Sequence, residues 1–220
     1  KRKIKSGICE IGILEHIMKI ICVGWNYGSH NAELYKEEKK EPVLFLKPET
    51  SLLRENKPFY LPDFSQQVEH EAELVVRIGK MGKNIGVKFA ERYIDAITIG
   101  VDFTARDLQA AAKKAGAPWD ISKGFDNSAP IGEFIDKSEF ADLQNINFSL
   151  SKNGKIVQSG NSGEMITSIA EIVSLASKYF TLKTGDLIFT GTPSGVGKVE
   201  IGDEIKGFIE GKELLNFSVK

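Results

Sequence analysis

Stretches typical of β-strands outnumber helical ones in this chain, and the two kinds do not alternate. Runs rich in Val, Ile, Leu and Phe predict strands at 19–23, 43–46, 68–78, 96–103, 147–150, 155–158, 186–190, 204–209 and 214–219. Helical patterns are credible over 104–115 and 162–176. A doubly wound parallel sheet requires strands and helices in alternation. We therefore predict a β-rich α+β fold with helices packed outside the sheets.

Capping and turn residues set the expected boundaries of these elements. Thr104 is expected to cap the first helix and Gly116 to end it, and Ser162 to cap the second. Asn153-Gly154 predicts a tight hairpin, because both residues tolerate positive φ. Gly211-Lys212 is expected to close another hairpin at the C-terminal end.

Composition excludes several classes of protein. A chain of 220 residues and 24.3 kDa buries about 70% of its surface on folding, so its core needs no disulfide or metal. The two cysteines, Cys9 and Cys22, form neither a disulfide framework nor a zinc motif and suit a reducing cytosol, which predicts a cytoplasmic protein. Twenty-nine basic against 30 acidic residues argue against nucleic-acid binding, which needs a basic excess. No apolar run approaches the ~18 residues of a membrane span.

The N-terminal segment is expected to lie outside the fold. Its apolar pattern is broken by Glu10, Glu15 and His16, so it lacks the continuous apolar run of an export signal. Met18 stands directly before the first strand-like stretch. We predict that residues 1–17 are a vector-derived or non-core extension and that 18–220 form one catalytic domain.

Two glutamates stand on one of the most apolar strand-like stretches. Alternate strand residues share a face, so Glu71 and Glu73 lie about 6.5–7 Å apart at Cα and can converge on one point. Two like charges near a buried region repel each other unless a cation lies between them. The alternative is an exposed face on which both glutamates keep an edge strand soluble.

A third carboxylate stands where the next strand-like stretch leads into a helix. Asp102 lies near this junction, and Arg106 and Gln109 share one face of the helix. Three carboxylates without Cys or paired His suit Mg²⁺, Mn²⁺ or Ca²⁺ rather than zinc. The alternative for Asp102 is a helix-capping role.

Three further segments carry groups suited to chemistry. His30 and Glu33 are spaced so that, on one helical turn, the carboxylate could orient the imidazole as a base for water; the alternative is a surface contact. The segment 122–126 (SKGFD) contains Lys123. The glycine-rich segment 189–197 (FTGTPSGVG) follows a short strand, and it lacks the Gly-Lys-Ser/Thr of a phosphate-binding loop.

Together these segments resemble the fumarylacetoacetate hydrolase family, in its short single-domain form. That form includes acylpyruvate hydrolases, oxaloacetate decarboxylases and 2-hydroxyhepta-2,4-diene-1,7-dioate isomerases. The matching elements, in order over 18–220, are GWNYGSHNAEL, FLKP, EHEAELVVRIGK, GVDFTARDLQ, PWDISKGFD and FTGTPSGVG. The resemblance implies a mixed β-sheet roll flanked by helices, found as a homodimer. It also implies that Glu71, Glu73 and Asp102 bind a metal ion, usually Mg²⁺.

The resemblance gives roles to further residues. His30 and Glu33 match a water-activating pair on a loop that closes over the substrate, and Lys123 matches a lysine that reaches the substrate oxygens. The positions expected around the ligand are Lys47, Arg106, Gln109 and Thr192. Trp25 departs from the family, in which many members have arginine, and this difference concerns substrate recognition rather than the metal site.

The implied function is Mg²⁺-dependent hydrolysis of a C–C bond in an acylpyruvate-like 2,4-dioxo acid, through a metal-bound pyruvate enolate. The alternatives are an oxaloacetate decarboxylase or a 2-hydroxyhepta-2,4-diene-1,7-dioate isomerase of aromatic catabolism, because the same site supports all three reactions. A non-catalytic metal-binding module is a remote alternative. The expected partner is a small 2-oxo acid, with neither nucleic acid nor membrane.

Overall fold

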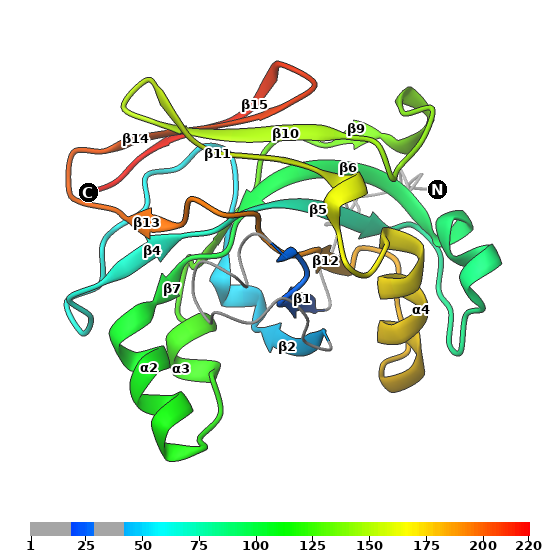
Figure 1. Cartoon of the computed structure of the whole chain (residues 1–220), viewed down its shortest axis with the longest axis horizontal. Helices are drawn as coiled ribbons and strands as arrows, with labels where there is room; N and C mark the ends of the chain where they lie inside the picture. Colours follow the sequence, from blue (N-terminus) through cyan, green and yellow to red (C-terminus); the bar gives the residue numbers. More distant parts are fainter. Residues whose placement is uncertain (1–18, 29–41) are drawn as a thin grey trace, which may run out of the picture.

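The computed structural model describes residues 19–28 and 42–220. The expected extension 1–17 lies outside these residues. Two large sheets pack against each other, and the helices lie at two sides of the molecule, away from the outer face of the four-stranded sheet (Figure 1). The predicted β-rich α+β fold is confirmed. None of the helices in the described ranges is long and apolar enough to cross a bilayer.

The larger sheet has six strands in the order β2-β1-β12-β5-β6-β9. Its strands are β1 (Ile20–Gly24), β2 (Val43–Lys47), β5 (Ala72–Ile78), β6 (Ile94–Val101), β9 (Ile135–Asp136) and β12 (Leu187–Phe189). The sheet is mixed, because β1 and β12 run parallel while the other neighbours are antiparallel.

The second sheet has four antiparallel strands in the order β11-β10-β14-β15. They are β10 (Asn147–Lys152), β11 (Lys155–Asn161), β14 (Glu204–Ile209) and β15 (Lys212–Ser218). The two sheets approach closely at Gly207 of β14, where an added Cβ would lie 2.9 Å from Ile99 Cγ2 of β6. The main hydrophobic core lies between them, with Ile99, Leu150 and Ile205 fully buried.

Two small sheets and the helices complete the fold. The small sheets are β13 (Gly197–Lys198), β4 (Val68–His70) and β7 (Thr104–Ala105), and β3 (Leu52–Leu53) with β8 (Ala129–Pro130). The α-helices are α2 (Arg106–Ala115), α3 (Asp120–Lys123) and α4 (Ile169–Tyr179). The 3₁₀ turns are η1 (Glu49–Ser51), η2 (Val87–Tyr93), η3 (Lys137–Glu139) and η4 (Ser162–Glu164). Helices α2 and α3 lie together on one side of the molecule and α4 on the other (Figure 1).

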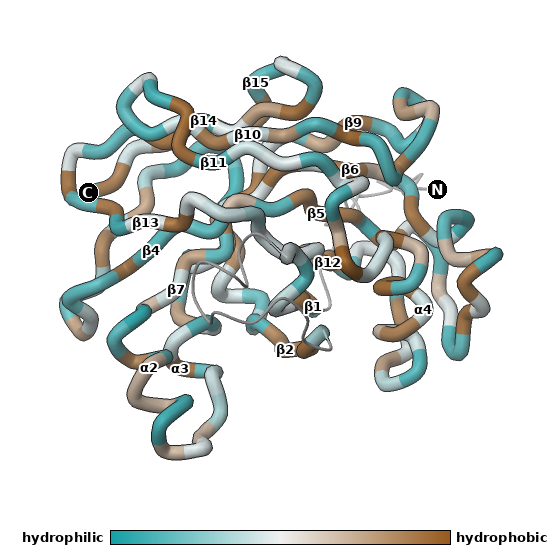
Figure 2. Tube along the Cα trace, in the orientation of Figure 1, coloured by the Kyte–Doolittle hydropathy of each residue, from teal (hydrophilic) through white to brown (hydrophobic). Residues whose placement is uncertain are grey.

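Both expected helix starts are wrong. Thr104 pairs with Glu69 as part of β7, so it stays extended and α2 begins at Arg106 without a side-chain cap. Helix α4 begins at Ile169, where Ser168 and Glu171 form a capping box. Ser162 instead starts the turn η4, and its hydroxyl accepts the backbone N–H of Ile146 at 2.8 Å. Hydrophobic and hydrophilic residues alternate along α4 (Figure 2), as expected for a helix with one buried face.

Other expected boundaries are confirmed. Helix α2 ends at Gly116, which has φ of +64°. Asn153-Gly154 closes the β10–β11 hairpin with φ of 51° and 76°. The β14–β15 hairpin also forms, but its turn residues are Glu210 and Gly211, one position earlier than expected.

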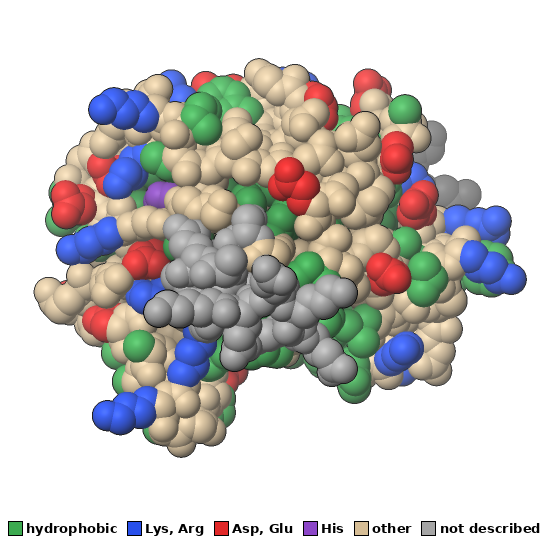
Figure 3. Space-filling model, in the orientation of Figure 1, with side chains coloured by type: hydrophobic (Ala, Val, Ile, Leu, Met, Phe, Trp, Pro, Cys, Tyr) green, Lys and Arg blue, Asp and Glu red, His purple; other side chains and the backbone are tan. Residues whose placement is uncertain are grey.

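Charged side chains are spread over the surface. On the face shown in Figure 3, Lys and Arg are interspersed with Asp and Glu. This mixture agrees with the near-zero net charge of −1. The positive groups that matter for the site lie inside the protein.

Candidate active site

Three carboxylates meet where β4 gives way to β5. The predicted strand 68–78 is interrupted at Glu71, because β4 pairs with β7 and β13 while β5 joins the six-stranded sheet. The backbone N–H of Asp102, just after β6, donates to the Glu71 carbonyl at 2.8 Å. Glu73, two residues on, pairs with Gly100 of β6. One oxygen from each carboxylate lies within 4.8 Å of the others.

Burial decides between the two interpretations of these carboxylates. Glu71, Glu73 and Asp102 are only 5%, 2% and 0% exposed. The glutamates therefore do not solubilise an edge strand. Asp102 lies outside α2, which begins four residues later, so it is not a helix cap.

Glu73 is the carboxylate of the triad whose negative charge is least compensated by the described residues. Burial, together with the charges of Asp102 and Glu71, raises the pKa of Glu73 well above its usual value. Its Oε2 accepts the backbone N–H of Gly191 at 2.7 Å, but no Lys or Arg of the described ranges forms an ion pair with it. Three buried oxygen ligands, one without a cationic partner, fit a hard divalent cation.

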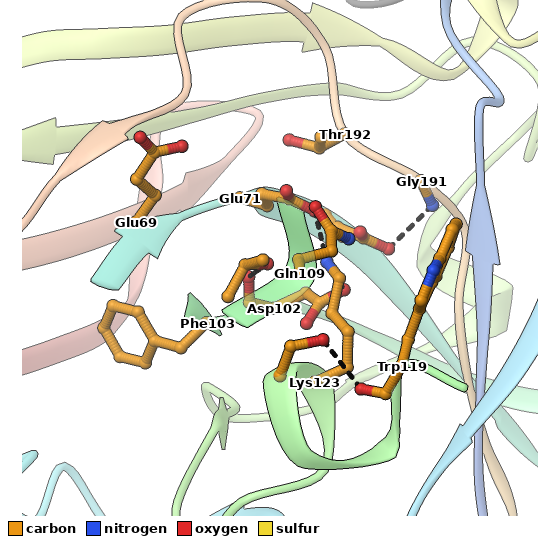
Figure 4. A network of polar contacts seen from close by, with 12 residues as sticks. Glu69, Glu71, Asp102, Phe103, Gln109, Trp119, Lys123, Gly191 and Thr192 are labelled. Atoms are coloured by element: carbon orange, nitrogen blue, oxygen red, sulfur yellow. Dashed lines mark hydrogen bonds and ion pairs between the residues drawn. The ribbon is translucent and has the colours of Figure 1, made fainter. Parts of the chain in front are cut away.

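Lys123 reaches into the triad from α3 (Figure 4). Its Nζ lies 2.8 Å from Glu71 Oε2 and 2.7 Å from Asp102 Oδ2. Burial disfavours the charged amine, but Asp102 and Glu71 outweigh that effect and hold the pKa of Lys123 above its usual value. Lys123 is therefore an ammonium group that can donate hydrogen bonds beside the carboxylates.

Lys47 lies behind Asp102 rather than in the pocket. Its Nζ forms an ion pair with Asp102 Oδ1 at 2.8 Å and hydrogen bonds with Ser128 Oγ at 2.9 Å. It also donates to the carbonyls of Phe103, Ser128 and Lys123. Because these acceptors surround the ammonium and Lys47 does not line the pocket of the triad, its position suits holding Asp102 and α3 rather than contacting a ligand.

The pocket around the triad combines charged, polar and aromatic side chains. Its lining residues are Val23, Gly24, Trp25, Phe45, Glu71, Glu73, Asp102, Arg106, Gln109, Trp119, Lys123 and Thr192. In Figure 4, Lys123 and Trp119 lie on one side of the carboxylates and Thr192 on the opposite side. Of the positions expected around the ligand, Arg106, Gln109 and Thr192 line this pocket.

Arg106 links Gln109 to two glutamates. It donates to Glu69 Oε2 at 2.7 Å, Glu71 Oε1 at 2.5 Å and Gln109 Oε1 at 2.8 Å. Burial disfavours the charged guanidinium, but Glu71 and Glu69 raise the pKa of Arg106 above its usual value. The expectation that Arg106 and Gln109 share a helix face is confirmed. Gln109 Oε1 also accepts from Lys113 at 3.2 Å, which leaves the Nε2–H groups of Gln109 as donors for a ligand.

The aromatic wall of the pocket was not predicted. Trp119 makes edge-to-face contacts with Trp25 and Phe45, both with ring centroids 5.9 Å apart. Lys123 Nζ lies 5.2 Å from the centroid of the Phe45 ring. Trp119 and Phe45 stand in the matched segments PWDISKGFD and FLKP, close in sequence to Lys123 and Lys47. This closeness was the sequence signal that could have predicted their place in the pocket.

His30 and Glu33 lie outside the described residues. Their role as a water-activating pair stays a prediction from the sequence.

Comparisons with known proteins agree with this site. The model of the family "Fumarylacetoacetate (FAA) hydrolase C-terminal" matches residues 19–219. The chain belongs to this family. Oxaloacetate tautomerase YcgM of Escherichia coli strain K12 is 42% identical, over 90% of this chain and 91% of the relative. The mitochondrial oxaloacetate decarboxylase of Dictyostelium discoideum is 44% identical, over 88% and 89%.

A solved structure of the family adds a ligand. The fumarylpyruvate hydrolase of Pseudomonas aeruginosa, solved in complex with Mn²⁺ and pyruvate, superposes with a TM-score of 0.88. It is 36% identical, and the match covers 92% of this chain and 89% of that one. The expected family and fold, and the expectation of an enzyme, are confirmed.

Proposed function

We propose that this protein is a divalent-metal-dependent enzyme that acts on a small 2-oxo acid, and that its first substrate is oxaloacetate, whose keto and enol forms it interconverts. The observation that carries this proposal is the buried triad Glu71, Glu73 and Asp102 with the Lys123 ammonium against it. The names of the tautomerase and decarboxylase relatives support oxaloacetate over the acylpyruvate favoured by the sequence.

The three carboxylates would hold Mg²⁺, with Mn²⁺ as its natural substitute. Their oxygens are the ligands that both ions prefer. When bound, the cation polarises the 2-oxo group and makes the C3–H bond of the substrate more acidic. Lys47, from behind, and Arg106, from the side, keep Asp102 and Glu71 in place for this task.

Hydrogen-bond donors of the chain would bind the substrate oxygens. The Lys123 ammonium donates to the oxygen on C2, on which negative charge develops when C3 loses its proton. Gln109 Nε2 and the Thr192 hydroxyl line the same pocket and suit the carboxylate oxygens of the substrate.

Tautomerisation moves two protons. In the forward direction the base takes the C3 proton of the keto form, and the C2 oxygen takes a proton from solvent as the enol leaves the site. The reverse reaction returns a proton to C3. Lys123 donates to Glu71 and Asp102 from inside the pocket, and this position suits stabilising the C2 oxygen rather than acting as the base. His30, oriented by Glu33, is the proposed base at C3.

The test follows the conversion of enol to keto oxaloacetate by ultraviolet absorbance, with Mg²⁺ and after EDTA treatment. We expect a rate well above that of Mg²⁺ in buffer, lost on chelation and in Lys123→Met. The exposed Glu91 supplies the control Glu91→Gln, which should keep the rate. A rate no higher than that of buffer with Mg²⁺ would exclude this function.

Hydrolysis of an acylpyruvate is the second candidate. It is favoured by the similarity to the fumarylpyruvate hydrolase with Mn²⁺ and pyruvate. Cleavage of acetylpyruvate to acetate and pyruvate, followed in the same preparations, distinguishes it from tautomerisation.

A further inference from the structure

Gln158 is a buried side chain with a full set of hydrogen bonds next to the site. It belongs to β11 of the four-stranded sheet and is 2% exposed. Its Oε1 accepts the backbone N–H of Ala72 at 2.9 Å and lies 2.9 Å from His70 Nδ1. Its Nε2 donates to Thr192 Oγ1 at 2.8 Å and to the Pro193 carbonyl at 3.0 Å. An amide has two donors and two acceptor positions, and all four are in use.

The orientation of the Gln158 amide is fixed by two partners, one of which can only donate a hydrogen bond and the other only accept one. The backbone N–H of Ala72 can only donate, and the carbonyl of Pro193 can only accept. Oε1 must therefore face Ala72, and Nε2 must face Pro193. It follows that His70 donates from Nδ1 and that Thr192 Oγ1 accepts from Gln158.

The chain is shaped to bring Gln158 to this place. The pairing of β10 with β11 shifts register next to Gln158, so that Val157 has no partner in the ladder, and such bulges redirect side chains. The loop after β12 passes so close that a Cβ on Gly195, which has φ of +96°, would lie 2.3 Å from the Val157 carbonyl oxygen. The register shift at Val157 and the close approach of Gly195 both lie where β11 contacts the loop that carries Thr192.

The bond from Gln158 decides what the Thr192 hydroxyl can do. Because its oxygen accepts from Gln158, its own proton needs another acceptor. The Pro193 carbonyl is 3.4 Å away, which is long for a hydroxyl donor. Thr192 lines the pocket of the triad, where an oxygen of an anionic ligand is a better acceptor.

We propose that Gln158 is a positioning residue that makes the Thr192 hydroxyl a hydrogen-bond donor to an oxygen of the 2-oxo acid, and that joins this donor to the backbone at Ala72, beside Glu71. The proposal rests on the proposed function for the class of ligand. It adds a link between the two sheets, since Gln158 reaches from β11 to the start of β5.

The test measures binding rather than turnover. The probe is pyruvate, titrated by calorimetry into the Mn²⁺-loaded protein, and Mn²⁺ affinity is measured separately from the paramagnetic resonance of the free ion. Gln158→Glu keeps the acceptors for Ala72 and His70 but replaces the donors with a carboxylate oxygen, to which Thr192 would then donate. We expect pyruvate to bind about tenfold more weakly, the loss of one hydrogen bond to a charged group, with Mn²⁺ affinity changed less than threefold.

A double-mutant cycle separates this role from a general loss of structure. Thr192→Val should show the same loss as Gln158→Glu, the double variant no further loss, and Thr192→Ser nearly full affinity. Gln66→Glu, at an exposed glutamine, is the matched control. If Gln158→Glu fails to fold, Gln158→Met replaces it in the cycle with the same expected absence of additivity.

Several results would overturn the proposal. They are wild-type pyruvate affinity in the Gln158 variant, additive losses in the double variant, or a loss of Mn²⁺ affinity as large as that of pyruvate. If the parent protein does not bind pyruvate, this inference is wrong, and the conversion of oxaloacetate decides the proposed function separately. If pyruvate binds and shows the expected cycle but oxaloacetate is not converted, only the proposed function is wrong.

Discussion

Lys47 and Asp102 form an ion pair with an Nζ–Oδ1 distance of 2.8 Å, and their side chains are 0% and 1% exposed. Breaking a buried pair costs about 3–5 kcal/mol when the remaining charge has no other partner. Asp102 would keep its ion pair with Lys123, so we expect the lower end of this range for the loss of Lys47. The pair also connects β2 to the residue that follows β6, so its loss would disturb the triad.

Lys47→Met should therefore lower the melting temperature of the metal-free protein by about 10 °C, given 2–4 °C for each kcal/mol in a chain of this size. Lys57→Met is the matched control, since Lys57 forms an ion pair with Glu55 at 2.9 Å but both side chains are exposed, by 63% and 74%. The control should melt within about 1 °C of the parent protein. Equal shifts of the melting temperature in the two variants would show that the buried Lys47 pair stabilises the protein no more than the exposed Lys57 pair.

The position of Lys47 also shows where sequence reasoning ends. The sequence places a lysine after an apolar strand, and the resemblance assigns it to the ligand. Its actual acceptors, Asp102, Phe103 and Ser128, are distant in sequence and become neighbours only in the folded chain, where the end of β2 reaches the residues that follow β6. A lysine that holds a carboxylate from behind and one that contacts a ligand have the same local sequence.

The triad was predictable because strand periodicity is local. Glu71 and Glu73 share a face by alternation, and Asp102 stands where the next strand ends. The break at Glu71 was not predictable, because Val68–Ile78 contains no Gly, Pro or other turn residue and therefore reads as one continuous strand. Pairing with Thr104 and Gly197 decides where β4 stops. The same pairing overrides the capping preference of Thr104.

Glu73 provides a prediction for metal binding. Its raised pKa shows that its negative charge is costly in the metal-free protein, so Glu73→Gln should leave the metal-free melting temperature unchanged or higher. The parent protein should gain several degrees from Mg²⁺ or Mn²⁺ at about 100 times the dissociation constant, equivalent to about 2.7 kcal/mol. The variant should lose that gain.

The measurement is differential scanning fluorimetry with and without the ion, after dialysis against EDTA. Glu91→Gln, at an exposed position, controls for the loss of one charge. If Glu73→Gln keeps the full ion-dependent gain, the assignment of Glu73 as a metal ligand is incorrect.

Asp107 provides a prediction for pH dependence away from the triad. It accepts from Ser65 Oγ at 2.6 Å, from the backbone N–H of Gln66 at 2.9 Å and from that of Leu108 at 2.9 Å. Burial alone would raise the pKa of Asp107, but these hydrogen bonds outweigh it and lower the pKa. A carboxyl with a lowered pKa stabilises the fold above its unfolded pKa of about 3.9, and this stability disappears as the pH falls.

Asp107→Asn should thus melt a few degrees lower than the parent protein at pH 7, and the difference should shrink towards pH 3. Asp63→Asn, at an exposed carboxylate in the same region, should melt like the parent protein throughout. A difference for Asp107→Asn that is constant between pH 7 and pH 3 would mean that the ionised carboxylate is not the stabilising form.

His30 separates the reactions open to this site by their need for a base. Tautomerisation and acylpyruvate hydrolysis both require proton removal, from C3 or from water, and a general base is worth ~10²–10⁴-fold. Decarboxylation of oxaloacetate requires only that the carboxylate leaves as CO₂ while the remaining charge is stabilised. His30→Ala should therefore reduce kcat for the first two reactions by that factor and for decarboxylation much less, whereas Asp102→Ala should reduce all three.

The comparison needs saturating Mg²⁺ and separate kcat and KM values, because His30→Ala could also weaken substrate binding. Equal losses in kcat for all three reactions in His30→Ala would identify His30 as a group that positions the substrate, and the base would have to be sought elsewhere in the chain.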